Sequence, residues 1–147
     1  MLKITRQTDY AVRVLLLLAK QPEGKKLSTS HIRDEMLIPR AFIQRIVARL
    51  AAEKLVATFP GRDGGIMLSR PARQISLLEV VEAFEGRLCL SDCFDNGSLD
   101  CPFERDCPVR DRWGRLQAVM TRELKNINFS DLSRQGTPSR VKAASKG

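Results

Sequence analysis

Apolar residues recur at steps of three and four between residues 8 and 54, and this spacing predicts three consecutive helices. The first is expected over residues 8–20, capped by Thr8 or Asp9. The second is expected to start near Ser28 and to stop before Pro39, and the third to run from about residue 40 to 54. The expected core positions of the first and third helices are Val12, Leu15, Leu16, Ala19, Ile43, Ile46, Val47 and Leu50.

Beyond residue 54 the pattern changes to two β-prone runs, 55–59 and 66–68, separated by a turn rich in glycine. A fourth helix is expected over residues 76–84, ended by Gly86. Two helices, a short turn, a third helix and a hairpin form the order of a winged helix-turn-helix. The predicted fold class is therefore mainly α with a small β-hairpin, and residues 1–86 are predicted to form a winged helix-turn-helix DNA-binding domain.

A long helix is predicted over about residues 108–128, and its apolar residues form one stripe. They are Val109, Trp113, Leu116, Met120, Leu124 and Ile127. Such a stripe needs a partner, and a second copy of the chain is expected to supply it; the alternative is that the helix folds back on its own domain. The rest of the chain is predicted to form a cysteine-bearing cluster loop at 87–107, a dimerisation helix at 108–132 and a disordered basic tail at 133–147.

The composition adds a partner and a compartment to this outline. The chain of 147 residues is 43% hydrophobic, enough for a core, and its net charge of +8 favours an acidic partner such as nucleic acid. The apolar run 11–19 is interrupted by Arg13 and is much shorter than the roughly 20 residues that span a bilayer. With no signal-peptide pattern at the N-terminus, no membrane partner and a cytoplasmic location are expected.

The third helix of this motif enters the major groove, so polar residues at its start are expected to contact bases. Hydroxyls and amide groups at the start of the second helix suit phosphate, and the hairpin tip suits the minor groove or backbone. The alternative is an ordinary solvated helix face. The candidate DNA contacts are Ser28, Thr29, Arg40, Gln44, Arg45 and Arg62.

Three cysteines, Cys93, Cys101 and Cys107, lie in a polar stretch before the long helix. In a reducing compartment they indicate a metal or redox role, because structural disulfides are rare there. Thiolates are the usual ligands of iron–sulfur clusters. The fourth cysteine, Cys89, stands between two leucines and is interpreted as a core residue. A zinc site of all four cysteines, or cysteines with no shared role, are the alternatives.

The chain resembles the IscR/NsrR/RirA family of bacterial winged-helix regulators over about residues 1–132. Three stretches carry the resemblance together with the cysteine triplet: KITRQTDYAVR at 3–13, GRDGGIMLSRPA at 61–72 and ISLLEVV at 75–81. The resemblance implies a homodimeric transcription regulator, with repression as the expected sign. Its partner is a double-stranded DNA operator, and an iron–sulfur cluster sets its operator affinity.

The resemblance also implies a ligand set for that cluster. Cys93, Cys101 and Cys107 are the expected thiolate ligands, and Asp9 matches an aspartate that the partner subunit donates in NsrR members. Three thiolates and one oxygen suit 4Fe–4S better than 2Fe–2S, because each cubane iron needs one protein ligand. The gap between Cys93 and Cys101 resembles iron-responsive RirA and the Thr-Asp-Tyr opening resembles nitric-oxide-sensing NsrR, so iron, nitric oxide and redox state are the candidate signals.

Two positions depart from the family pattern. Arg110, which cannot bind iron, stands where IscR members have a histidine ligand, and Pro60 stands where the wing usually has arginine. Asp9 has a second interpretation as a helix cap. The alternative function is a cluster-free winged-helix regulator that senses thiol oxidation or a small molecule. An enzyme is not expected, because the sequence has no Gly-x-Gly-x-x-Gly motif and a single histidine, His31.

Overall fold

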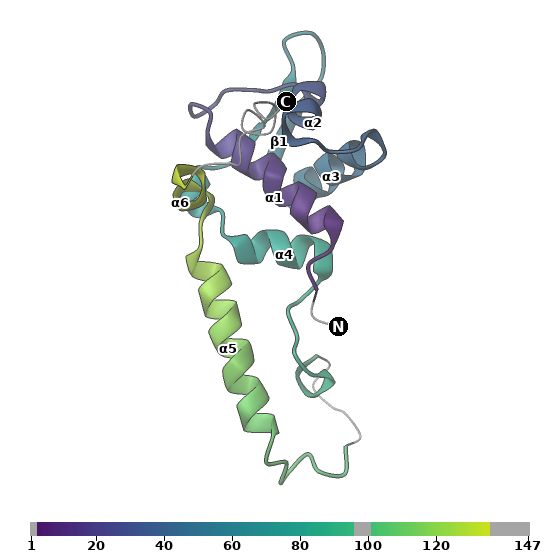
Figure 1. Ribbon diagram of the computed structural model, residues 1–147, viewed down its shortest axis with the longest axis vertical. Helices are drawn as coiled ribbons and strands as arrows, with labels where there is room; N and C mark the ends of the chain where they lie inside the picture. The colour runs from purple at the N-terminus through teal and green to yellow at the C-terminus, as the bar shows by residue number, and fades with distance from the viewer. Residues whose placement is uncertain (1–2, 96–100, 136–147) are drawn as a thin grey trace, which may run out of the picture.

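The computed structural model of the chain describes residues 3–95 and 101–135. A helical body carries a hairpin at one end, and one long helix runs away from it at the other (Figure 1). In chain order the elements are α1 (Arg6–Ala19), α2 (Thr29–Met36), α3 (Arg40–Ala52), β1 (Val56–Phe59), β2 (Gly65–Leu68), η1 (Ala72–Gln74), α4 (Leu77–Glu85), η2 (Asp92–Phe94), α5 (Arg110–Asn126) and α6 (Phe129–Arg134).

Helix α1 lies at the centre of the body and begins earlier than the sequence predicts. Its cap is Thr5, whose side chain accepts a hydrogen bond from the Thr8 amide, so the predicted caps Thr8 and Asp9 are both wrong. Thr8 is instead fully buried inside the helix. Because α2, α3, α4 and α6 all contact α1, it is buried on more sides than one apolar stripe would cover.

Helices α2 and α3 form the predicted helix-turn-helix. The Ser28 hydroxyl accepts a hydrogen bond from the His31 amide at 3.1 Å, which confirms Ser28 as the cap of α2. Leu37 ends α2 in the left-handed conformation at φ 54°, and Pro39 precedes the first residue of α3. The predicted stripe of α3 is confirmed, because its buried residues are Ile43, Ile46, Val47 and Leu50.

Strands β1 and β2 pair antiparallel and form the wing, with Val56 opposite Leu68 and Phe59 opposite Gly65. Leu27 joins the hairpin through a bridge to Ile66, which fixes the wing against the segment before α2. Gly65 is required there, because a Cβ atom at its φ of 139° would lie 2.8 Å from the Leu27 carbonyl oxygen.

The chain after the wing returns to the body before it leaves again in α5. Ser76 and Glu79 form a capping box at the start of α4, and Gly86 ends that helix as predicted. Helix α5 ends at Asn126, and Asn128 caps α6, whose Phe129 is fully buried in the core. The helix α6 therefore includes residues 133–134, where the sequence predicted a disordered tail; residues 136–147 lie outside the described residues.

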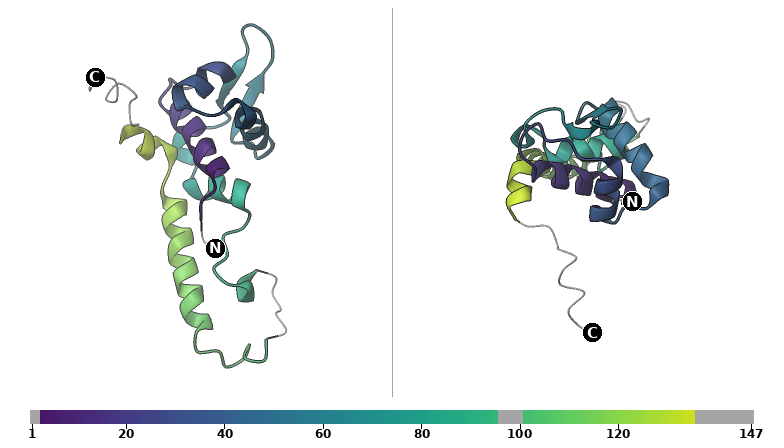
Figure 2. Two further views of the ribbon diagram at one scale, coloured as in Figure 1. Left: turned by 45° about the vertical axis from the view of Figure 1, so that its right-hand side comes forward. Right: turned by 90° about the horizontal axis from the view of Figure 1, so that it is seen from above.

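Helix α5 extends away from the body (Figures 1 and 2). None of its residues is buried. Its contacts with the body are made mainly through α4. Within the described residues no helix combines the length and the hydrophobicity needed to cross a bilayer. The predicted fold class, mainly helical with a small hairpin and a long C-terminal helix, is confirmed.

Candidate functional site

A groove of about 470 Å³ lies between the start of α2, the exposed side of α3 and the wing. We call it the α3–wing groove. Four of the six predicted DNA contacts line it, and they come from three separate elements: Ser28, Thr29, Gln44 and Arg62. The structure thus gathers a helix start, a recognition-helix side chain and a wing cation on one concave surface, which suits a nucleic-acid backbone and the base edges beside it.

The other two predicted contacts, Arg40 and Arg45, are exposed but lie outside this groove. Arg40 is the first residue of α3, and the Arg45 guanidinium lies 5.6 Å from the centre of the Phe42 ring. Aromatic contact limits the orientations of a guanidinium without neutralising it. Arg45 therefore remains available to a negatively charged partner beside the groove.

Lys26 is a further cation at this surface that sequence reasoning missed. Its ammonium lies 4.2 Å from the centre of the Phe59 ring, and Phe59 lines the α3–wing groove. The available signal was the Lys25–Lys26 pair, which is separated from the cap of α2 by Leu27 alone. The bridge between Leu27 and Ile66 and the contact with Phe59 hold this lysine against the wing, where it adds a positive charge beside the groove.

Arg49 of α3 is exposed, with 56% of its side chain accessible, and it contacts α4. Its Nε donates a hydrogen bond to the Ala83 carbonyl oxygen at 2.8 Å and lies 3.6 Å from the Glu53 carboxylate. The hydrogen bond joins α3 to the last turn of α4, two residues before Glu85.

Glu85 joins the same turn of α4 to the start of α1. Its Oε1 accepts hydrogen bonds from the Thr5 amide at 2.8 Å, from the Thr5 hydroxyl at 2.7 Å and from the Thr8 hydroxyl. Desolvation is the largest single influence and opposes ionisation, but the hydrogen bonds from Thr8 and Thr5 together lower the pKa of Glu85. The carboxylate is therefore held in its charged form between the two helices.

All four cysteines are free and half-buried. The Cys89 thiol donates to the Ser91 carbonyl oxygen at 3.0 Å, and the Ser91 hydroxyl donates to the Cys93 sulfur at 3.3 Å. Cys89 does not belong to the core, so its interpretation as a core residue is wrong. One serine contacts both cysteines, which places Cys89 and Cys93 in one local arrangement.

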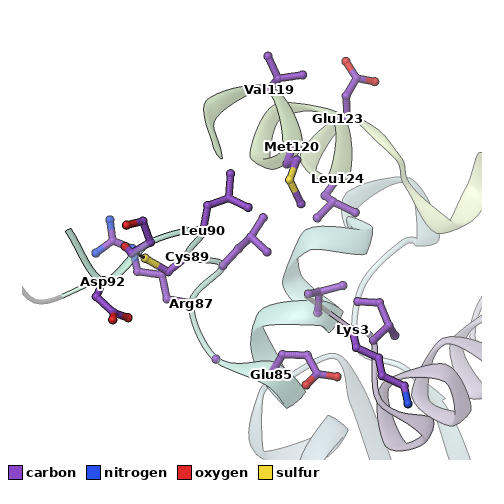
Figure 3. A pocket seen from close by; sticks show the side chains of 15 residues that line it. Lys3, Glu85, Arg87, Cys89, Leu90, Asp92, Val119, Met120, Glu123 and Leu124 are labelled. Carbon is purple, nitrogen blue, oxygen red and sulfur yellow. Dashed lines mark hydrogen bonds between the residues drawn. The ribbon is translucent and has the colours of Figure 1, made fainter. Parts of the chain in front are cut away.

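Cys89 lines an open cavity of about 900 Å³ between the end of α4, the chain after it and α5. Figure 3 shows Cys89 and Leu90 on one side of this cavity and Met120 and Leu124 of α5 on the other. Charged side chains, among them Lys3 and Glu85, stand at its edge (Figure 3). A cavity of this size is within the range of small-molecule sites.

The donor chemistry of the cysteine segment, residues 87–107, fits an iron–sulfur cluster, because free thiols are the ligands such clusters prefer. In the parts of the chain that the structure describes, no three His, Cys, Asp or Glu side chains come close enough to hold a single metal ion. Ligands of a cubane bind different irons, so they are spaced more widely than the ligands of one ion.

Asp9, the predicted fourth ligand, is exposed on the first turn of α1. Its carboxylate pairs with Arg13 at 2.7 Å. It is not the cap of α1, so the alternative interpretation of Asp9 is excluded. Both side chains of this ion pair are 40–50% exposed, and exposed ion pairs are weak. The Asp9 carboxylate is therefore accessible to a second chain.

Comparison with known proteins agrees with this architecture. A protein of Rhizobium meliloti strain 1021, named aau3, is 37% identical over 132 residues, which are 89% of this chain and 84% of that protein. The transcriptional regulator NsrR of Shouchella clausii is 30% identical over 131 residues, covering 89% and 88%. The structure of CymR, the global cysteine regulator of B. subtilis, matches with a TM-score of 0.76 at 21% identity, covering 93% of this chain and all of that one.

The family described as Rrf2, an iron-dependent transcriptional regulator, matches residues 4–135. That range includes the helix-turn-helix, the wing, the cysteine segment and α5. The regulators in this family are not enzymes, which confirms the prediction that the chain is not one. A helix-turn-helix with a wing, a long projecting helix and this match along nearly the whole chain lead to one conclusion: the chain belongs to the Rrf2 family of winged-helix transcription regulators.

Proposed function

We propose that this chain is a homodimeric, cytoplasmic repressor whose affinity for its operator is set by an iron–sulfur cluster. The observation that carries the proposal is the position of three free, half-buried thiols in the segment that joins the DNA-binding body to α5. Cys93, Cys101 and Cys107 are the proposed thiolate ligands, and Asp9 of the partner subunit is the proposed fourth. When bound, a 4Fe–4S cluster would supply a centre that reacts with oxygen or nitric oxide and depends on iron supply.

Of the predicted stripe, Met120 and Leu124 line the cavity beside α4 instead. Val109, directly before α5, and Trp113, Leu116 and Val119 on the helix support the dimer. These side chains are 42–51% exposed although they are large and apolar. A helix that exposes such a stripe is stabilised by packing on another helix, and two-fold pairing buries the same stripe twice. The family match to transcription regulators supports DNA as the partner of the opposite end of the molecule.

The last turn of α4 offers a physical link between the cysteine segment and the DNA surface. This turn bonds to α3 through the Ala83 carbonyl and to α1 through Glu85, and the cysteine segment begins directly after Gly86. A rearrangement of that segment that moved the turn would change the position of the recognition helix. Because the half-sites of an operator are separated by a fixed number of helical turns, a small change of this position costs affinity.

The test is an absorbance spectrum with iron and sulfide analysis on protein purified without oxygen. We expect broad visible absorbance and about four irons per chain. The Cys101→Ala variant should lose the absorbance, and the matched control Cys89→Ala should keep it, because Cys89 is outside the proposed ligand set. A colourless, iron-free wild-type protein would overturn the cluster proposal while leaving DNA binding untouched.

A second candidate function is a cluster-free regulator, and the cavity beside Cys89 is the observation that favours it. In this alternative, thiol oxidation or a small molecule in the cavity changes DNA affinity. The distinguishing experiment compares operator affinity of iron-free protein in its reduced and oxidised forms. A change that persists in iron-free protein and disappears in Cys89→Ala supports this alternative over the cluster.

A further inference from the structure

Three residues on one face of α5 contact the cysteine segment. Arg110, Gly114 and Gln117 are separated by four and three residues, so they lie above one another on the helix. The Arg110 Nη1 donates a hydrogen bond to the Glu104 carbonyl oxygen at 3.0 Å and lies 3.8 Å from the Glu104 carboxylate. The same guanidinium lies 6.0 Å from the centre of the Phe94 ring, at the limit of a cation–π contact.

Gly114 and Gln117 continue this contact along the helix. A Cβ atom at Gly114 would lie 3.4 Å from the Cζ atom of Phe94, so the ring rests against bare backbone. The Gln117 Oε1 accepts a hydrogen bond from the Leu90 amide at 3.1 Å. Successive turns of α5 therefore contact Glu104, Phe94 and Leu90.

The contacted residues stand beside all three proposed ligands along the chain. Leu90 and Phe94 lie on either side of Cys93, and Glu104 lies between Cys101 and Cys107. A backbone held at these points loses less conformational entropy when its thiols bind a cluster. Pre-organisation of this kind raises the affinity of the thiols for the cluster.

We propose that Arg110, Gly114 and Gln117 form a seat on α5 that holds the cysteine segment ready for its cluster, with Arg110 as the main positioning residue. The proposal rests on the proposed cluster function. Arg110 carries no atom that binds iron, so it acts through the backbone it holds. A planar guanidinium with five donors can contact a carbonyl and a ring at the same time, which a lysine ammonium does less well.

The first test is hydrogen exchange of the cluster-free protein, followed by mass spectrometry of peptides from residues 87–95 and 101–109. In Arg110→Met we expect exchange in residues 101–109 to be about fivefold faster, the factor for one lost hydrogen bond. In Gln117→Ala the Leu90 amide should exchange faster by a similar factor. The matched control is Arg115→Met, an exposed arginine of the same helix, which should leave both peptides unchanged.

The second test uses protein loaded with its cluster and measures the rate at which an iron chelator bleaches the absorbance. We expect bleaching several-fold faster in Arg110→Met than in Arg115→Met. Unchanged hydrogen exchange in Arg110→Met would overturn the seat, and faster exchange with unchanged bleaching would overturn its role for the cluster. If the wild-type protein holds no iron, the cluster function fails, and the exchange experiment still confirms or overturns the contacts themselves.

Discussion

Replacing Leu116 by alanine should weaken the proposed dimer while leaving each chain folded. Leu116 is 51% exposed on α5 in the single chain, and no residue of this helix is buried. Burying a whole leucine side chain contributes about 1.5–3 kcal/mol, so burying the exposed half contributes about 1 kcal/mol. Two-fold symmetry doubles this to about 2 kcal/mol for the dimer, which corresponds to an increase of about 30-fold in the dissociation constant.

The assay is sedimentation equilibrium over a range of protein concentrations. Leu37 is a well-matched control, because it is a leucine with 54% exposure that lies in the turn between α2 and α3, far along the chain from α5. The Leu37→Ala variant should dimerise like the wild type. A wild-type protein that stays monomeric, or two variants with equal dissociation constants, would refute the assignment of the α5 stripe as the dimer interface.

Three other predictions concern DNA binding and stability. Gln44→Ala should weaken binding to a DNA site selected from random duplexes by about 1–3 kcal/mol, and it should change binding to random DNA little. If Arg45→Ala weakens binding to the selected site and to random DNA equally, Arg45 contacts a phosphate. The pKa of Glu85 is lowered from its ordinary 4.5, so its carboxylate stabilises the fold above that pH and loses this effect in acid. Urea denaturation should therefore show a difference in the free energy of unfolding between wild type and Glu85→Gln, and this difference should close as the pH falls. Ser28→Ala removes the α2 cap and should lower the free energy of unfolding by about 1 kcal/mol in the same assay.

Local signals in the sequence were sufficient for most of the fold. Ser28 and Ser76 each cap a helix where the sequence predicts one, and the glycine-rich turn joins the two strands of the wing. The predicted start of α1 was wrong because Thr5 and Thr8 both carry a hydroxyl that could cap a helix at this point of the sequence. The choice depends on Glu85, which is 80 residues from Thr5 and hydrogen-bonds both threonines, and no local pattern contains that contact.

The candidate site was predictable in its chemistry and less so in its geometry. The cysteine triplet and the basic start of α3 could be read directly, but the division between groove residues and Arg45 depends on how the wing folds over α3. Cys89 was misread because its leucine neighbours resemble a core segment. In the structure that segment instead lines an open cavity, with residues of α5 on the opposite side.

Helix α5 carries its two proposed surfaces at positions that differ by a single residue. Val109, Trp113 and Leu116 form the apolar stripe, and the next residue after each belongs to the seat. One residue turns an α-helix by about 100°, so the two surfaces are neighbours on one rigid element. A rearrangement of the cysteine segment against the seat therefore acts directly on the helix that is proposed to join the two subunits. In the proposed dimer, the state of the proposed cluster would therefore act on the angle between the subunits through α5 alone, and so on the spacing of the two recognition helices on DNA.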